Sequence, residues 1–407
     1  MAEKENLIEK PIQNKITDDG EDEKKNSMKE ENQKEDDMVK KNEINEENKN
    51  VINEEKEEEI DLKMEDPIEI KEEKDLDKIK ENFERLEIMD FTSAKIVEKL
   101  NTIKFEKLEI LTLKNVGINS IDFLANDNFS SLIILELNNN SINSLNIINK
   151  VPFKNLQIFD VSSNALESIE ELAESPFKDL EILLMAKNKI QEVKQICDAN
   201  FNKLKKLDLS SNNIQSIDNL CCNKSLKYLE SLYLNENKIV DISKLENEIF
   251  KNLKDLQLSD NQIESIAVFE KSPFVGLEEL LLNGNKIKDI KPLSIPKFVN
   301  LKSLTLSKNE IGDINSLKDS KFSNLEKLDL FDNKIMDIEI LKDIPFKNIK
   351  ELDLSFNRLK SINILLTKSF SQLKDLKIEG NSLDYSHDNI QTLYKLYKIK
   401  YTYNSLF

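Results

Sequence analysis

The sequence predicts an α/β repeat solenoid, with a parallel β-sheet on its concave face and 3₁₀ or helical turns on its convex face. Three observations predict it. The motif L-x-x-L-x-L-x-x-N-x-I recurs at an almost constant period of 24 residues. Within each copy, apolar and polar residues alternate as in a β-strand, and apolar residues then follow at a spacing of three. Since a fixed period of this size specifies stacked units, about thirteen 24-residue repeats are expected.

The N-terminal residues carry most of the net charge of −18. Residues 1–80 hold 29 acidic and 16 basic residues, a net charge of −13, and no aromatic residue. Such a segment cannot bury enough apolar area to offset its ordering entropy, so residues 1–71 are predicted to form a disordered acidic arm. The acidic balance argues against non-specific binding to nucleic acid or to anionic membranes.

Residues 72–85 are predicted to form an N-terminal capping helix. Leu76, Ile79 and Phe83 recur at spacings of three and four, which gives one apolar stripe. A terminal solenoid repeat needs a cover with a polar outer face. A degenerate first repeat is then placed at Leu86, and the repeat array is expected to span residues 86–384.

Twelve further copies of the motif follow the degenerate one. Their spacing is 24 residues except for one step of 25, and they begin at Leu108, Leu132, Leu156, Leu180, Leu204, Leu229, Leu253, Leu277, Leu301, Leu325, Ile349 and Leu373. The asparagine of the motif has an amide that can donate to and accept from backbone groups that the turn leaves unpaired. A stacked asparagine ladder is therefore expected at Asn140, Asn164, Asn188, Asn212, Asn237, Asn261, Asn285, Asn309, Asn333, Asn357 and Asn381.

The convex side and the C-terminus complete the prediction. The spacing of Ile214, Ile217 and Leu220, repeated in the other copies, suits 3₁₀ or helical turns. A phenylalanine three residues before most leading leucines predicts a continuous aromatic spine, which begins at Phe105. Residues 385–407 depart from the repeat and are expected to form a C-terminal cap with a short helix and an edge strand.

The N-x-I-x-x-I-x-x-L segment resembles the SDS22-like class of leucine-rich repeats, which includes a nuclear regulatory subunit of protein phosphatase 1. The run from Ile287 to Leu293 is also similar to the repeats of bacterial internalins. The resemblance implies a leucine-rich-repeat horseshoe that serves as a protein-binding scaffold. The period is 24 here, against the 22 usual in that class, and the C-terminus lacks the cap motif of the class.

The outward positions of the strands are the expected contact surface. One row is isoleucine in five successive repeats, next to Leu184, and polar in the later ones, so it predicts an apolar ridge for a partner: Ile88, Ile110, Ile134, Ile158 and Ile182. Isoleucine also favours strands, and the cap or the acidic arm could cover this row. Further partner-binding candidates on the concave face are Asp208, Tyr233, Asp329, Phe331 and Asp353, since a phosphatase-binding face should combine acidic and aromatic residues.

The residue types of catalytic and metal sites are scarce. One histidine, three cysteines and six glycines exclude the common zinc, dinucleotide and phosphate-loop motifs, so no catalytic, cofactor-binding or metal-binding residue is expected. The start of the chain has no apolar signal region, and the cysteines do not suggest a disulfide framework. A monomer located in the cytoplasm or the nucleus is predicted.

The predicted function is a non-catalytic scaffold or adaptor that binds a protein partner through its concave surface. A regulatory subunit of protein phosphatase 1 is the first alternative. An acidic chaperone for basic nuclear proteins is the second, in which the arm would carry binding. A surface adhesin is the third, and it would require non-classical export.

Overall fold

The computed structural model describes residues 70–383 without 222–223 and 296, together with residues 392–393 and 395. Contacts divide the chain into Met1–Lys63 and Met64–Phe407, and all described residues belong to the second unit. The predicted acidic arm, except residues 70–71, and most of the predicted C-terminal cap lie outside the described residues. The predictions for those segments therefore stay predictions.

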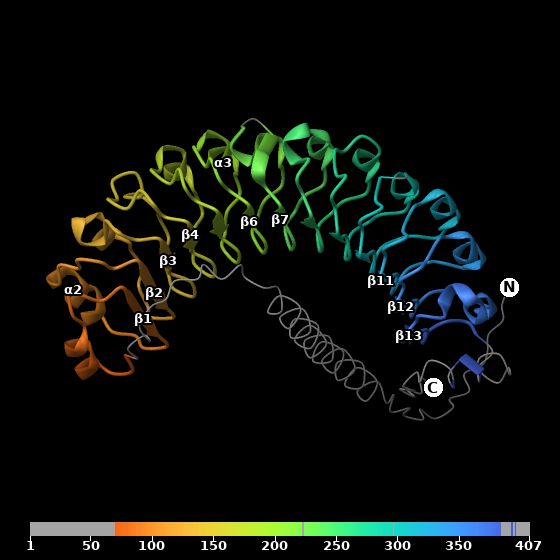
Figure 1. Cartoon of the computed structure of the whole chain (residues 1–407), viewed down its shortest axis with the longest axis horizontal. Helices are drawn as coiled ribbons and strands as arrows, with labels where there is room; N and C mark the ends of the chain where they lie inside the picture. The colour runs from red at the N-terminus through yellow and green to blue at the C-terminus, as the bar shows by residue number, and fades with distance from the viewer. Residues whose placement is uncertain (1–69, 222–223, 296, 384–391, 394, 396–407) are drawn as a thin grey trace, which may run out of the picture. The chain divides into compact units, whose positions relative to one another are not determined.

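The repeats form an arc whose inner side is one sheet of 13 parallel strands (Figure 1). Strand order follows sequence order, and each strand pairs in register with the next, one repeat further on. The strands are β1 Arg85–Met89, β2 Ile110–Lys114, β3 Ile134–Glu136, β4 Ile158–Asp160, β5 Ile182–Leu184, β6 Lys206–Asp208, β7 Ser231–Tyr233, β8 Asp255–Gln257, β9 Glu279–Leu281, β10 Ser303–Thr305, β11 Lys327–Asp329, β12 Glu351–Asp353 and β13 Asp375–Lys377.

Short helices lie on the outer side of the arc, as the spacing of three predicts (Figure 1). Two are α-helices, α2 Lys95–Thr102 and α3 Lys194–Asp198. The 3₁₀ helices are η1 Glu73–Lys78, η2 Asp122–Ala125, η3 Asp127–Phe129, η4 Glu170–Glu174, η5 Asp218–Cys221, η6 Lys224–Tyr228, η7 Ser243–Glu246, η8 Glu248–Phe250, η9 Ala267–Glu270, η10 Lys291–Ser294, η11 Asn315–Asp319, η12 Glu339–Asp343, η13 Asn363–Leu366 and η14 Lys368–Phe370.

The register corrects the alignment of the degenerate first repeat. Leu86 pairs with Leu111, so the leading apolar residue of this repeat is Phe83 and not Leu86. Ile88 consequently takes an inward core position with no exposed surface, and Arg85 takes the outward position that pairs with Ile110 in β2. The expectation that Ile88 belongs to the apolar ridge is wrong. The inward side chain is buried because the true motif is Phe-x-x-Leu-x-Ile.

The N-terminal cap is shorter than residues 72–85. It consists of η1, whose Leu76 is buried, and of Ile70, which forms a parallel bridge with Ile88 at the outer edge of β1. The Asp75 carboxylate accepts hydrogen bonds from the backbone N–H groups of Lys71 and Glu72. The chain therefore covers the first edge strand, which would otherwise offer unpaired backbone groups to another chain.

The asparagine ladder satisfies backbone groups along the whole array. In the repeat of β6, the Asn212 Nδ2 donates to the carbonyls of Met185, Leu209 and Ser210 at 3.0–3.1 Å. Its Oδ1 accepts from the Ile190 N–H of the preceding repeat at 3.0 Å. The eight asparagines from Asn188 to Asn357 are buried, because each repeat covers the one before it. Each asparagine thus joins two repeats with a single side chain.

The core lies between the sheet and the convex turns. The phenylalanines of the spine are all buried, and Phe153 and Phe177 stack with ring centroids 5.8 Å apart. A second row of side chains holds the convex turns, since each accepts a hydrogen bond from the N–H two residues later: Ser120, Ser144, Ser168, Ser216, Asp241, Ser265, Asp289, Asp313, Asp337 and Ser361. With the core so fixed, the strands differ mainly in their outward residues.

Candidate functional site

The ridge row is the first outward position of each strand, from Ile110 in β2 to Asp375 in β13. Ile134, Ile158 and Ile182 lie side by side in this row, and each is half-buried. Ile110 is buried, with 8% of its surface exposed, so it adds little to a contact surface. The apolar ridge that remains spans β3 to β5 and is widened by Leu184, which is also half-buried.

The middle row is the second outward position and contains four aspartates. In each, a carboxylate oxygen accepts a hydrogen bond at 2.8–2.9 Å from the backbone N–H two residues later: Asp160 from Ser162, Asp208 from Ser210, Asp329 from Phe331 and Asp353 from Ser355. These side chains therefore hold the turn that follows the strand. Asp208, Asp329 and Asp353, which the sequence predicts as partner-binding residues, thus stabilise their own turns as well.

Burial raises the pKa of three of these aspartates. The pKa of Asp160 rises to about 6 through burial, with Glu136 and Asp208 adding repulsion. The pKa of Asp353 also rises to about 6 through burial and through the neighbouring charge of Asp329. Burial raises the pKa of Asp208 as well, against the opposing effect of Lys206. An ionised carboxylate in this row is thus poorly solvated. A cationic group of a partner would stabilise the ionised form.

Tyr233 is placed differently from the expectation. It sits in the middle row on β7, but only 6% of its surface is exposed. The Lys206 Nζ lies 4.8 Å from the centroid of its ring, a cation–π contact within the sheet. The ring therefore packs between neighbouring strands, and the structure does not present Tyr233 as an open contact residue.

Phe331 lies just beyond β11, where it contacts a second aromatic residue. Its ring and that of Phe356 meet edge to face, with centroids 5.3 Å apart and planes at 64°. Phe331 is half-buried, whereas 49% of Phe356 is exposed. The two side chains form an aromatic pair at the end of the strands that also carry Asp329 and Asp353.

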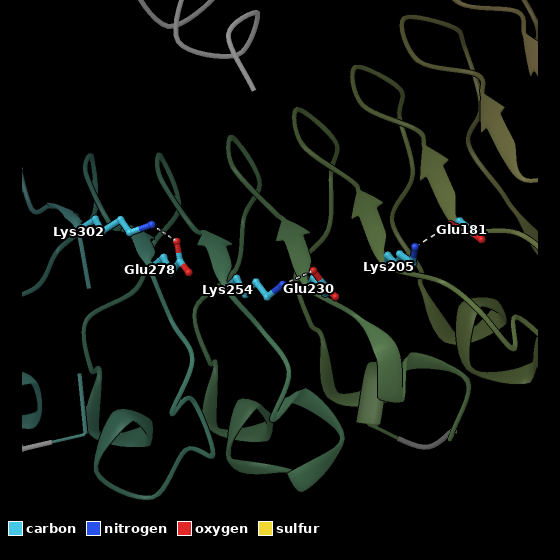
Figure 2. Close-up of polar contacts among 6 residues, drawn as sticks. All are labelled: Glu181, Lys205, Glu230, Lys254, Glu278 and Lys302. Atoms are coloured by element: carbon cyan, nitrogen blue, oxygen red, sulfur yellow. Dashed lines mark hydrogen bonds and ion pairs between the residues drawn. The ribbon is translucent and has the colours of Figure 1, made fainter. Parts of the chain in front are cut away.

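A third row, the rim row, immediately precedes the ridge row. Here glutamate and lysine alternate from Glu181 to Lys350, a pattern that motif reading overlooks because these positions vary between copies. Figure 2 shows three ion pairs between neighbouring repeats, Lys205–Glu181, Lys254–Glu230 and Lys302–Glu278, with N–O distances of 2.5–3.0 Å. Lys350 and Glu326 form a fourth pair at 2.6 Å. These charges cancel within the row, so the net charge of the face resides in the other two rows.

The described residues also bear on metal binding and membrane insertion. No three His, Cys, Asp or Glu side chains there come together in an arrangement that could hold a metal ion. Within the same part of the chain, no helix has the length and apolar character needed to cross a membrane.

These features define the class of protein. An open parallel sheet, a ladder of asparagines that is buried from Asn188 to Asn357 and helical turns on the convex side form a leucine-rich-repeat horseshoe, and the chain is a leucine-rich-repeat protein. A family model described as leucine-rich repeats (2 copies) matches residues 202–247, 275–319 and 299–343. No curated protein matches the sequence. The match assigns the repeat class and leaves the SDS22-like subclass unassigned.

Particular solved structures share this fold. An internalin, InlF of Listeria monocytogenes, is 24% identical with a TM-score of 0.65, and the alignment covers 80% of this chain and 87% of that one. A chain of the LRIM1/APL1C complex is 24% identical with a TM-score of 0.56, covering 80% and 57%. The ectodomain of the Arabidopsis thaliana receptor kinase GASSHO1/SCHENGEN3, in complex with Casparian strip integrity factor 2, is 20% identical with a TM-score of 0.50, covering 74% and 42%. At these identities the likeness concerns the fold.

Proposed function

We propose that this protein is a non-catalytic scaffold that binds a protein partner through its concave face. The observation that carries the proposal is the apolar ridge of Ile134, Ile158, Ile182 and Leu184, which lies half-exposed on an open sheet. Contiguous apolar surface of this kind usually marks a contact site. Leucine-rich-repeat proteins generally act as interaction scaffolds, and two of the similar structures are complexes with other proteins.

We propose no catalytic role because the carboxylates with raised pKa values already accept backbone hydrogen bonds. Asp160 and Asp353 have raised pKa values, but each binds the backbone of its own turn. They lie eight strands apart, on β4 and β12, so they cannot act as an acid and base pair on one substrate. The location proposed with this function is the cytoplasm or nucleus, which the few cysteines support.

A regulatory subunit of protein phosphatase 1 is a narrower version of the same proposal. It is favoured by the aromatic and acidic residues that meet at Phe331, Asp329 and Asp353. The buried Tyr233 does not contribute to such a surface. Purified phosphatase catalytic subunit should bind the wild type and lose affinity for an Asp329→Lys/Asp353→Lys variant. Equal binding to both, or none to the wild type, would remove this version and leave the scaffold proposal intact.

The scaffold proposal is tested by affinity capture with an Ile134→Glu/Ile158→Glu variant. The matched control is Ser231→Glu/Ser303→Glu, which places the same charge in the same row on β7 and β10. Circular dichroism first establishes that both variants fold. A protein that binds the wild type and the serine control, is lost from the isoleucine variant, and rebinds after purification supports the proposal. Identical partners for all three proteins would contradict the ridge as the binding site.

A further inference from the structure

The aromatic pair of Phe331 and Phe356 exposes apolar surface at the end of β11 and β12, where 49% of Phe356 is exposed. Phe356 lies one residue before the ladder asparagine Asn357, in a turn that is otherwise polar. Its ring lies over Gly380 of the next repeat, where an added Cβ would come within 2.8 Å of the Phe356 Cδ1. Because Gly380 has no side chain, the ring of Phe356 can lie against its backbone.

Phe356 also departs from the other residues at its position in the repeat. This position has a left-handed backbone in all thirteen repeats, with φ of +53° at Phe356. A bulky residue is unfavourable there, whereas asparagine, aspartate and glycine tolerate it. The other repeats use small or polar residues: Asp90, Asn115, Asn139, Ser163, Lys187, Ser211, Glu236, Asp260, Gly284, Lys308, Asp332 and Gly380. Phe356 therefore combines an unfavourable backbone conformation with a ring of which burial explains only half, since 49% of the residue is exposed.

The surroundings of the aromatic pair are acidic. Asp329 and Asp353 lie on the adjoining strands, and Asp332 and Glu379 are exposed in the adjoining turns. The Lys377 Nζ is 3.8 Å from the Asp353 carboxylate, and the exposed Lys308 lies in the turn next to Phe331, so two lysines compensate only part of the charge of the four carboxylates. An arginine side chain fits such a surface, because its planar guanidinium stacks on an aromatic ring and bonds a carboxylate at the same time.

We propose that the aromatic pair and the carboxylates beside it bind an arginine-bearing segment of the partner protein, with an aliphatic residue next to the arginine. The guanidinium would lie on the exposed face of Phe356 and reach Asp353, and the aliphatic side chain would contact Phe331. This inference rests on the proposed scaffold function and adds a second contact, eight repeats beyond the start of the apolar ridge.

The test uses the full chain and a labelled peptide of three Arg-Leu-Gly-Ser units, with fluorescence anisotropy at physiological salt. The informative variant is Phe356→Asn, because asparagine removes the ring and suits the left-handed backbone. Its control is Lys187→Asn, which introduces the same residue at the same left-handed turn position of a distant repeat. A peptide with glutamate in place of arginine measures charge selectivity. The acidic N-terminal residues are common to all variants and so do not affect their differences.

The expected result is that Phe356→Asn weakens the arginine peptide at least about tenfold while its Tm stays equal to or above that of the wild type. Lys187→Asn and Ile134→Glu/Ile158→Glu should bind the peptide normally, and the glutamate peptide should not bind. Unchanged binding by Phe356→Asn, or no binding to the wild type, would overturn the inference. If only Ile134→Glu/Ile158→Glu lost peptide binding, the inference would also be overturned. The peptide would then bind at the apolar ridge, as the proposed function allows.

Discussion

The repeats of β3–β5 and those of β11–β13 have the same interior and different outward surfaces. Inward positions are apolar in both, as Leu135 and Leu328 illustrate, and the asparagine ladder runs through both. Outward positions on β3–β5 combine isoleucine and leucine with Glu136 and Asp160, whereas those on β11–β13 are only carboxylates and lysines, with the aromatic pair just beyond the strands. Stacking therefore constrains only the inward residues, and the chemistry of a partner has to be inferred from the outward rows.

The largest effect should come from the interior and should be equal in the two regions. Phe177→Ala near β5 and Phe322→Ala near β11 each remove a ring with no exposed surface, so each should lower the free energy of unfolding by about 3–5 kcal/mol. Urea denaturation followed by circular dichroism measures both. Because repeat arrays can unfold in segments, coincident transitions at two wavelengths serve as the check.

A strongly unequal pair of results would break the comparison. If Phe322→Ala were nearly neutral, the C-terminal repeats would be loosely packed, and their outward surface would not be a fixed binding site. A smaller substitution, Phe322→Leu, keeps much of the buried volume and should lose clearly less stability than Phe322→Ala.

The next largest effect is expected from the ladder. Replacing Asn212 by leucine leaves the Ile190 N–H and the Met185 carbonyl without their side-chain partner, which should lower stability by about 1–3 kcal/mol. Asn213→Leu is the matched control, because its side chain accepts only an exposed lysine contact. Thermal unfolding of both variants distinguishes a ladder bond from a general effect of leucine, and equal losses would contradict the ladder.

The sequence predicted the repeated interior well. The period placed the thirteen strands of the described residues, the convex turns and the ladder, because each depends on contacts that recur in every copy. The first repeat was misaligned by three residues, since Phe83 replaces its leading leucine and the motif with Leu86 and Ile88 then resembles a later start. The helix α2 was not foreseen either, because the misaligned start hid that its buried Ile96 takes the position of Ile121 in the next repeat.

The candidate site was harder to predict because it depends on exposure and pairing. Sequence periodicity identified Tyr233 as outward, but a neighbouring lysine and the adjacent strands bury it. It identified the middle-row aspartates without showing that they bind their own turns. The contact between Phe331 and Phe356 joins two different positions of neighbouring repeats, so no single row of the alignment displays it.

A smaller effect on stability is expected from the raised pKa values of Asp160 and Asp353, which lie in the two regions. The two aspartates should differ in peptide binding. The folded pKa values of Asp160 and Asp353 are about 6, above the ordinary 3.8, so the folded protein binds more protons than the unfolded chain in this window. Their contribution to stability is therefore lost as pH rises from about 4 to 6. Asp160→Asn and Asp353→Asn should each raise stability at pH 7 by about 1–2 kcal/mol, because the amide oxygen can still accept the turn N–H.

Chemical denaturation at pH 4.5 and at pH 7 measures this gain, which should shrink at the lower pH. Only Asp353→Asn should also weaken the arginine peptide, because Asp160 lies near the ridge and not near the aromatic pair. A stability gain that is the same at both pH values would show that desolvation of the charge is not its cause. Equal peptide binding by the two variants would remove the functional difference between the regions.

The smallest effect is expected from the rim row, which runs through both regions. The Glu278–Lys302 pair is exposed, with side-chain exposures of 40% and 56%, so solvent screens its attraction. Glu278→Gln and Lys302→Gln should each change stability by less than about 0.5 kcal/mol, and a double-mutant cycle should give a coupling energy of similar size.

The alternation of glutamate and lysine along the rim row implies instead that these charges keep neighbouring strands free of like-charge contacts. Replacing Glu278 by lysine, which creates three adjacent lysines with Lys254 and Lys302, should therefore lower stability more than Glu278→Gln, and it should do so only at low salt. An equal loss in high salt would show that the row acts through packing and not through charge.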